Sequence, residues 1–530
     1  MAGGSGSAST SIDIEGLLKD FPDRMRTTLP EELCIYHVPV DIRQVNKDAY
    51  TPQVICIGPI HQKIENQVMK ELKRRYFKQF LDRLPVEKQK PVREDLVETI
   101  TGRVDKIRKC YEDAAYELCK DPKACELKIH NCYEDAAFEP RKDPKGCEVE
   151  ILDCSEDDSS KRCEDPKVFW KMILWDAVFI FELFLKNREF DQEDRKKNKD
   201  KYKYDYIIAK PWLQSAVQRD LILLENQLPF WILDDLYGIV SKYIITCCSC
   251  LPKTDSSCRP ETDKTFCSCL PPKTGCSCQP ETDKTCCSCL PETDCCFPCI
   301  TFLELTCTFF EMYNEKKNSP DKPLHFTDLV RSFYLPEDPS TPPSSPIIEL
   351  HRATSRLDQA GIKFKPKKNE YFINIRSWTE DDSIKKGELH VPILVIDDHT
   401  DCIFRNLMAL EQCHYPYEAF ICGYVIFLDC LVDTKEDADL LIESGVISNK
   451  LGESDDVAKL INKLCIGMVE VSSCYSNIAT DLNTYYGSWF NTSKAYLRRQ
   501  YFKNVWVGTG TVVGLIVLLI TLGNFVRSFF

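Results

Sequence analysis

The stretch 218–237, QRDLILLENQLPFWILDDLY, constrains the fold of this chain more than any other. Large apolar side chains fill more than half of its positions and would surround the whole circumference of a helix, so a helix here is buried on most sides. Pro229 cannot lie inside a helix without losing a hydrogen bond and clashing with the preceding turn. The stretch therefore predicts two buried helices that meet at Leu228–Pro229, with Pro229 in the first turn of the second.

Three polar residues, Glu225, Asn226 and Gln227, fall at this predicted junction. Buried polar groups need hydrogen-bond partners. The backbone groups that are left free at two helix ends can supply them. We therefore expect these side chains to bind the ends of the two helices.

Five blocks of the sequence resemble the plant domain-of-unknown-function 247 family, and they occur in the order found in that family. They are LLENQLPFWIL within the stretch above, VPVDIRQVNKDAYTPQVICIGPIHQ (38–62), FWKMILWDAVFIFELFL (169–185), LHVPILVIDDHTDCIFRNLMALEQC (389–413) and WFNTSKAYLRRQYFKNVWV (489–507). The resemblance implies membership of this family. It says very little about biochemical activity, because most of the family has no assigned biochemistry. Some grass members resemble pollen-expressed determinants of self-incompatibility, in which a membrane-associated protein meets a small pistil partner.

The composition is that of a globular protein, with 43% apolar and 28% charged residues in 530 positions. A chain of this length folds into one or two domains with a large core. The net charge of −14 argues against a general nucleic-acid binder, which would carry a basic face.

The periodicity predicts a mainly α fold: a large helical body with a small β element and one C-terminal transmembrane helix. The predicted portions are a disordered N-terminus (1–11), a helical first portion (12–335), a Pro-rich linker (336–346), a second portion (347–500) and the transmembrane helix (505–526). Helices are expected at 12–28, 62–84, 168–186, 300–335, 349–364, 400–431 and 454–485, and strands at 371–378 and 388–397, with extended and turn segments at 34–62 and a charged loop at 193–205.

A tandem repeat of 22 residues occupies 110–167. CYEDAA begins at Cys110 and again at Cys132, and KDPKAC is followed 22 positions later by KDPKGC. Each Asp-Pro interrupts a helix, and the copies hold few aliphatic residues. The repeat therefore predicts an exposed, expanded helix–turn unit, with an enlarged recognition surface as the functional alternative.

A second repeat-built segment, 247–299, holds fourteen of the thirty cysteines. It is rich in proline and poor in large aliphatic residues, which predicts an insertion without a conventional core. Thiolates two positions apart could bind a soft cation such as zinc or copper(I); palmitoylation, disulfides or a loop without ligand are the alternatives. The metal candidates are Cys248, Cys250, Cys267, Cys269, Cys276, Cys278, Cys287 and Cys289.

The N-terminus has neither a basic region nor an apolar run of the secretory type, so we expect a reducing compartment and free thiols.

The segment 505–526 has no charge and, at 1.5 Å per residue, is long enough for a bilayer core of about 30 Å. Four basic residues precede it and only Arg527 follows. Basic residues favour the cytosolic side, so the main body is expected in the cytosol. The sequon at Asn491 would argue for the opposite topology if it were glycosylated.

Gly510 and Gly514 lie four positions apart in this segment. Small residues at this spacing allow two membrane helices to approach closely, which predicts a homodimer through this face.

No constellation for catalysis or cofactor binding stands out. His37 and His61 are expected to be structural, and Asp397–Asp398–His399 is explained by a helix cap at Asp398 or Thr400. We therefore expect a membrane-anchored recognition protein without enzymatic activity or cofactor, whose partners are the membrane and a protein. The alternatives are a membrane-tethered enzyme and a Cys-rich protein that binds or senses metal.

Overall fold

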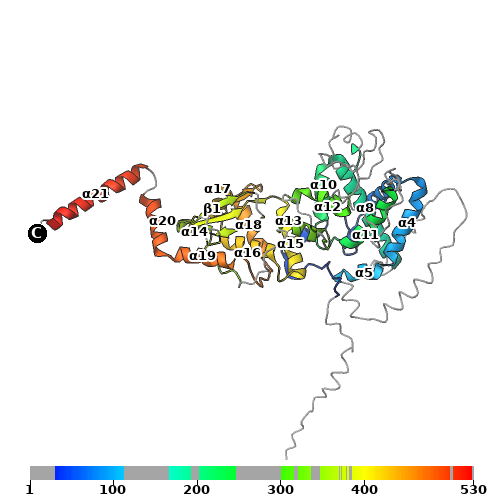
Figure 1. Ribbon diagram of the computed structural model, residues 1–530, viewed down its shortest axis with the longest axis horizontal. Coiled ribbons are helices and arrows are strands. Elements are labelled where there is room, and N and C mark those ends of the chain that lie inside the picture. Colours follow the sequence, from blue (N-terminus) through cyan, green and yellow to red (C-terminus); the bar gives the residue numbers. More distant parts are fainter. Residues whose placement is uncertain are drawn as a thin grey trace, which may run out of the picture.

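The computed structural model describes most of the two predicted portions (Figure 1). The described residues are 30–112, 166–191, 202–245, 300–335 apart from 315–319 and 321, 347–501 apart from 369–370, 372, 378 and 381–384, and 505–527. Several predictions therefore concern residues outside this set: the N-terminus 1–11, the helix 12–28, nearly all of the repeat 110–167, most of the loop 193–205, the insertion 247–299 and the linker 336–346.

The prediction of a mainly helical body with a small β element is confirmed. The helices of the first portion are α2 (Val40–Val45), α3 (Gln67–Asp82), α4 (Val86–Thr101), α5 (Val104–Lys109), α8 (Pro166–Asp191), α10 (Pro211–Asp220), α11 (Phe230–Ile245), α12 (Phe302–Phe309) and α13 (Phe326–Tyr334), with short 3-10 turns η1 (Lys47–Tyr50), η2 (Gln62–Ile64) and η3 (Glu311–Tyr313).

Helix α8 is the centre of this helical lobe, and α3, α4, α11 and α12 pack against it. Its side chains from Asp176 to Asn187 are all buried, as a helix that is apolar on every side predicts. Phe181 meets the ring of Phe302 edge-on at 5.3 Å, and Phe184 stacks on Phe309 at 4.2 Å. These rings join α8 to α12.

The second portion contains two small sheets and the remaining helices. They are α14 (Thr354–Gln359), β1 (Lys363–Lys367), β2 (Arg376–Ser377), β3 (Glu388–Pro392), β4 (Leu394–Ile396), α15 (Thr400–His414), α16 (Phe420–Leu431), α17 (Lys435–Glu443), β5 (Ile447–Asn449), α18 (Ser454–Leu464), α19 (Ser476–Gly487), α20 (Trp489–Tyr501) and α21 (Val505–Arg527). β3 is central in the first sheet, parallel to β1 and antiparallel to β2, and β4 pairs in parallel with β5.

Two expected elements differ in detail. The helix expected at 349–364 begins only at Thr354, and it ends at Gln359, just before Gly361, where it was expected to stop; Gly361 has a φ of +98° and leads the chain into β1. The strand expected at 388–397 divides into β3 and β4, which belong to different sheets. The pairing of β3 with β1 and of β4 with β5 decides this division, and no local pattern encodes it.

The helices expected at 400–431 and 454–485 are each interrupted. Tyr415 ends α15 because the next residue, Pro416, disfavours helical backbone at the position before it. Between α18 and α19 the chain turns at Gly467, whose φ is +81°. The segment 34–62, expected to form extended and turn segments, contains the short helix α2 and the 3-10 turn η1, and η2 begins at its last residue.

The stretch 218–237 forms only one of its two predicted helices in full. α10 ends at Asp220, and α11 begins at Phe230, directly after Pro229. Residues 221–229 between them are not helical, although all are buried. The prediction that the first helix extends to Leu228 is therefore wrong, whereas the second helix begins next to Pro229 as predicted.

The two portions share a continuous core. A smaller cluster combines residues 33–50 with Leu224 of the first portion and with Ala409 and Leu410 of α15. The N-terminal segment therefore lies where the two portions meet (Figure 1).

Candidate functional site at the Glu225 junction

The irregular segment 221–229 is buried, so its backbone groups and polar side chains need partners inside the protein. Gln227 supplies part of them within the segment itself. Its Nε2 donates to the carbonyl oxygens of Leu221 at 2.7 Å and Leu223 at 2.8 Å, and its Oε1 accepts from the Phe326 amide at 3.0 Å. The Gln227 side chain thus closes the turn after α10 and joins it to α13.

Asn226 binds the N-terminal segment instead. Its Oδ1 accepts from the Ile57 amide at 2.6 Å, and its Nδ2 donates to the carbonyl of Ile55 at 2.9 Å. Nδ2 also donates to the carbonyl of Asp220 at 2.8 Å. One side-chain amide therefore takes the place of a strand partner for residues 55–57.

Two buried carboxylates bind further backbone amides of the loop 53–58. Asp220 accepts from three successive amides, those of Gln53, Val54 and Ile55, at 2.6–3.0 Å. Asp176 of α8 accepts from the Gly58 amide at 2.9 Å.

Asp176 also pairs with a buried lysine. Lys73 Nζ lies 2.5 Å from the Asp176 carboxylate and 2.5 Å from that of Glu65, and it donates to the Cys56 carbonyl at 2.6 Å. Burial raises the pKa of Asp176 to about 6, against the effect of the neighbouring ammonium.

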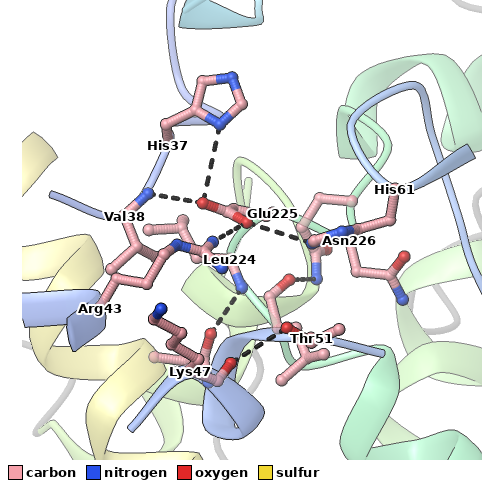
Figure 2. Close-up of polar contacts among 12 residues, drawn as sticks. His37, Val38, Arg43, Lys47, Thr51, His61, Leu224, Glu225 and Asn226 are labelled. Carbon is pink, nitrogen blue, oxygen red and sulfur yellow. Dashed lines mark hydrogen bonds and ion pairs between the residues drawn. The ribbon is translucent and has the colours of Figure 1, made fainter. Parts of the chain in front are cut away.

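Glu225 is the most highly connected acid of the junction (Figure 2). Its Oε1 accepts from the Val38 amide at 2.7 Å and lies 3.7 Å from His37 Nδ1. Its Oε2 pairs with the Arg43 guanidinium and lies 3.1 Å from His61 Nε2. The Glu225 side chain is 2% exposed, whereas those of His37 and Arg43 are 41% and 27% exposed. The junction is thus buried at the acid and open at its basic rim.

Burial alone would raise the pKa of Glu225. The close contacts with His37, His61 and Arg43 and the hydrogen bond from the Val38 amide outweigh burial and hold the pKa of Glu225 well below its usual range. Glu225 is therefore ionised at neutral pH and fixed by donors on several sides.

Helix α15 adds a third segment to the junction. Asn406 Oδ1 accepts from the Leu224 amide at 2.9 Å, and its Nδ2 donates to the carbonyls of Ala49 and Cys402, each at 2.8 Å. Residues near 50, 224 and 406 are therefore held by a single side chain.

A second group of buried charges ties α13 to the helices that follow. Arg331 donates to Glu411 at 2.9 Å and to the Glu418 carbonyl at 2.7 Å. Glu411 also accepts from the amides of Ile421 and Cys422 at the start of α16. His325, fully buried at the start of α13, lies 3.0 Å from the Cys34 carbonyl through Nε2, and burial lowers its pKa to about 4.

The buried acids of the junction and of this second group hold parts of the chain in place. The carboxylates of Asp176, Asp220, Glu225 and Glu411 all accept backbone N–H groups or pair with cations of the chain. Within the described ranges, no group of three or more His, Cys, Asp or Glu residues could hold a metal ion.

The structure brings together sequence blocks that lie far apart in the chain. The blocks 38–62, LLENQLPFWIL (223–233) and 389–413 meet at the junction, and block 169–185 contributes Asp176. His37 and His61 both lie against Glu225. The sequence did not predict this pairing; the only signal was the presence of polar residues inside an apolar stretch.

The remaining candidates lie elsewhere. The eight cysteines proposed as metal ligands fall outside the described residues. Gly510 and Gly514 lie in α21, and no described atom comes within 4 Å of a Cβ built on either. The helix cap expected at Asp398 or Thr400 is not formed: His399 is the N-cap residue of α15, and its side chain makes no capping hydrogen bond. Asp397 makes the turn instead, accepting from the His399 amide at 3.0 Å and the Thr400 hydroxyl at 3.1 Å.

Sequence comparisons place these blocks in one protein family. A family model described as a plant protein of unknown function, DUF247, matches residues 35–520. The UPF0481 protein At3g47200 of Arabidopsis thaliana is 26% identical over 523 residues, which cover 93% of this chain and 85% of that protein. The putative UPF0481 protein At3g02645 of the same plant is 29% identical over 140 residues, about a quarter of each chain. No solved structure matches the chain. The match over nearly the whole length establishes that this chain belongs to the DUF247 family of plant proteins.

Proposed function

We propose that this chain is a membrane-anchored plant recognition protein whose main body lies in the cytosol and performs no catalysis. Helix α21 carries the proposal. Its residues Gly508–Arg527 are long and apolar enough to cross a membrane, and none of them is buried in the protein. An apolar helix of this length outside the core is costly in water and suits a bilayer.

The charges beside α21 support the cytosolic orientation. Four basic residues, Lys494, Arg498, Arg499 and Lys503, precede its uncharged segment, and basic residues favour the cytosolic side of a membrane. Asn491 of the sequon donates through Nδ2 to the Tyr485 carbonyl at 3.3 Å. Its amide is thus engaged with the body, which supports an unmodified side chain.

The junction supports recognition rather than catalysis. Its acids are ionised or buried against donors of the chain itself, and such groups organise a scaffold instead of acting on a substrate. The alternative of a membrane-tethered enzyme predicts turnover when the purified chain is incubated with a broad panel of substrates. The alternative of a metal-binding protein predicts zinc or copper in the chain after purification.

The proposed partner of the body is another protein. The resemblance to grass self-incompatibility proteins suggests pollen–pistil recognition with a small secreted pistil protein. Such a partner meets the body directly only if the body faces the cell exterior. Topology therefore distinguishes a direct meeting with a secreted partner from recognition of a cytosolic one.

Protease protection in sealed microsomes tests the proposal. With a tag at the N-terminus, we expect the chain to stay in the membrane pellet at alkaline pH and the tag to be digested without detergent. A chain released by alkali would contradict the anchor. A tag protected until detergent is added would place the body in the lumen and contradict the cytosolic assignment.

We also propose that α21 forms a homodimer through Gly510 and Gly514. Close approach over small residues is a common route to helix association in lipid. Replacement of both glycines by isoleucine should abolish cross-linking between chains in membranes and leave insertion intact. Cross-linking that persists in the double variant, or is absent in the wild type, would show that α21 is an anchor only.

A further inference from the structure

Helix α20, directly before the proposed anchor, contacts the body along one side. Arg499 pairs with Asp358 of α14, and Asn491 bonds the Tyr485 carbonyl at the end of α19. Ala495 lies so close to Gly361 that a Cβ on that glycine would be 3.1 Å from its side chain. The residues of α20 that hold it to the body are therefore 491, 495 and 499, which recur every four positions on one helix face.

The opposite side of α20 is aromatic and exposed, and no residue of α20 is buried. The exposed fractions are 79% for Trp489, 67% for Phe490, 63% for Tyr496, 50% for Leu497 and 44% for Tyr501. At about 100° per residue these side chains share one arc of roughly 140°. Lys494 and Arg498 follow at the edge of this arc, between it and the face that contacts the body.

We propose that α20 lies in the headgroup region of the bilayer that α21 crosses. Its aromatic face points to the acyl chains, and Lys494 and Arg498 contact anionic lipid headgroups. The inference rests on the proposed membrane anchoring.

Three observations identify the bilayer as the occupant of this face. Only residues 502–504 separate α20 from α21, so α20 cannot lie far from the membrane surface. Figure 1 shows α20 across the end of the body and α21 leaving it at an angle, as a surface helix followed by a spanning helix requires. Tryptophan and tyrosine concentrate at membrane interfaces, and basic residues beside them attract anionic lipids.

Photocrosslinking of the full-length chain in vesicles tests the position of α20. p-Benzoylphenylalanine replaces Phe490 or Leu497 in vesicles of phosphatidylcholine with phosphatidylserine. Leu515 in α21 reports the anchor, and Trp212 of α10, an aromatic residue 68% exposed at the far lobe, is the matched control. We expect lipid adducts at 490, 497 and 515 and none at 212.

The outcomes separate the two proposals. Absence of lipid adducts at 515 overturns the anchor itself. Adducts at 515 without adducts at 490 and 497 overturn the position of α20 and leave the anchor standing. Adducts to protein at 490 and 497 show a partner chain on this face, and adducts at 212 equal to those at 490 show unspecific labelling; both overturn the proposal.

The basic edge has its own test. With the photoprobe at 490, Lys494→Gln with Arg498→Gln should lower the adduct yield in anionic vesicles by roughly fivefold for each charge removed, and leave it unchanged in pure phosphatidylcholine. Lys435→Gln with Lys450→Gln removes two exposed charges elsewhere and should change neither yield. An unchanged yield in the first variant, or an equal loss in the control, overturns the role of this edge.

Discussion

Gly58 lies directly against the backbone of Gln227: a Cβ built on Gly58 would fall far inside van der Waals contact with the Gln227 carbonyl oxygen. Gly58 also has a φ of +72°, a conformation that other residues rarely adopt. Close approach of these two backbones lets the N-terminal loop reach the segment after α10. The family blocks 38–62 and 223–233 are thus two halves of one contact.

Gly58→Ala should lower the free energy of unfolding by about 2–4 kcal/mol, because the methyl group meets backbone that cannot move aside and φ is strained. Chemical unfolding of the detergent-solubilised chain measures this. Gly238→Ala in α11 is the matched control, since no described atom lies within 4 Å of a Cβ there. Alanine favours helix, so the control should be neutral or more stable by up to about 1 kcal/mol. Equal effects in both variants would contradict the role of the contact.

Asn226→Asp keeps the shape of the side chain and removes its two donors. The carbonyls of Ile55 and Asp220 would then face a carboxylate instead of an amide. We expect a loss of roughly 3 kcal/mol or more, because buried acceptors and a buried charge are left without partners. Asn462→Asp is the control: Asn462 donates to the Asp433 carbonyl near the surface, and its replacement should cost less than about 1 kcal/mol. A small loss at Asn226 would mean that water or a shifted backbone satisfies these carbonyls.

Glu225→Gln should destabilise the protein by about 2–4 kcal/mol at pH 7, since Arg43 and the two histidines lose their anion. The pKa of Glu225 is lowered in the folded state, so its contribution is fully present above the ordinary carboxyl pKa of about 4.3 and is lost as the pH falls below that value. The part of the difference that comes from the Glu225 carboxylate should therefore be present above about pH 5 and shrink in acid. Glu71→Gln, which removes a solvent-exposed partner of Arg74, should cost less than about 1 kcal/mol. A difference that grows in acid would contradict the assigned pKa.

Removal of 250–296, with a short Gly/Ser linker in its place, should leave the thermal midpoint of the protein within a few degrees. The flanking helices support this expectation, because α11 packs on α12 through Phe230 and Tyr237, whose rings lie 5.1 and 5.6 Å from that of Phe302. Removal of the buried segment 176–187 of α8, with the same linker in its place, should prevent folding and serves as the contrast. A loss on the order of 3 kcal/mol or more for 250–296 would indicate a structural disulfide or metal in the insertion.

Local patterns predicted the long elements well. The apolar segment 168–186 lies in α8, as predicted. The periodic segment 62–84 contains α3, which is capped by the side chain of Asn66, an acceptor for the Met69 amide. These elements depend on residues that are neighbours in the sequence. The apolar C-terminal segment likewise became α21.

The junction could be predicted only in part. The polar residues 225–227 were expected to bind helix ends, and Gln227 does bind the turn after α10. Asn226 also binds the carbonyl of Asp220 at the end of α10. Its other side-chain partners and those of Glu225 lie 164 or more positions earlier, such as Val38 and Ile57. The apolar side chains of residues 221–229 predicted helix there. The contacts that keep this backbone irregular come from remote residues, and no local pattern in the sequence reveals them.

The hydrogen bond between Asn406 and the Ala49 carbonyl spans 357 positions, and it has a consequence for synthesis. At about 5–20 residues per second, a ribosome needs roughly 20–70 s to add the residues between them. During that interval the apolar segment 33–57 has emerged while one of its partners does not yet exist. This segment therefore lacks one of its packing partners until α15 has been translated, and we expect slowed elongation between 226 and 406 to increase its aggregation.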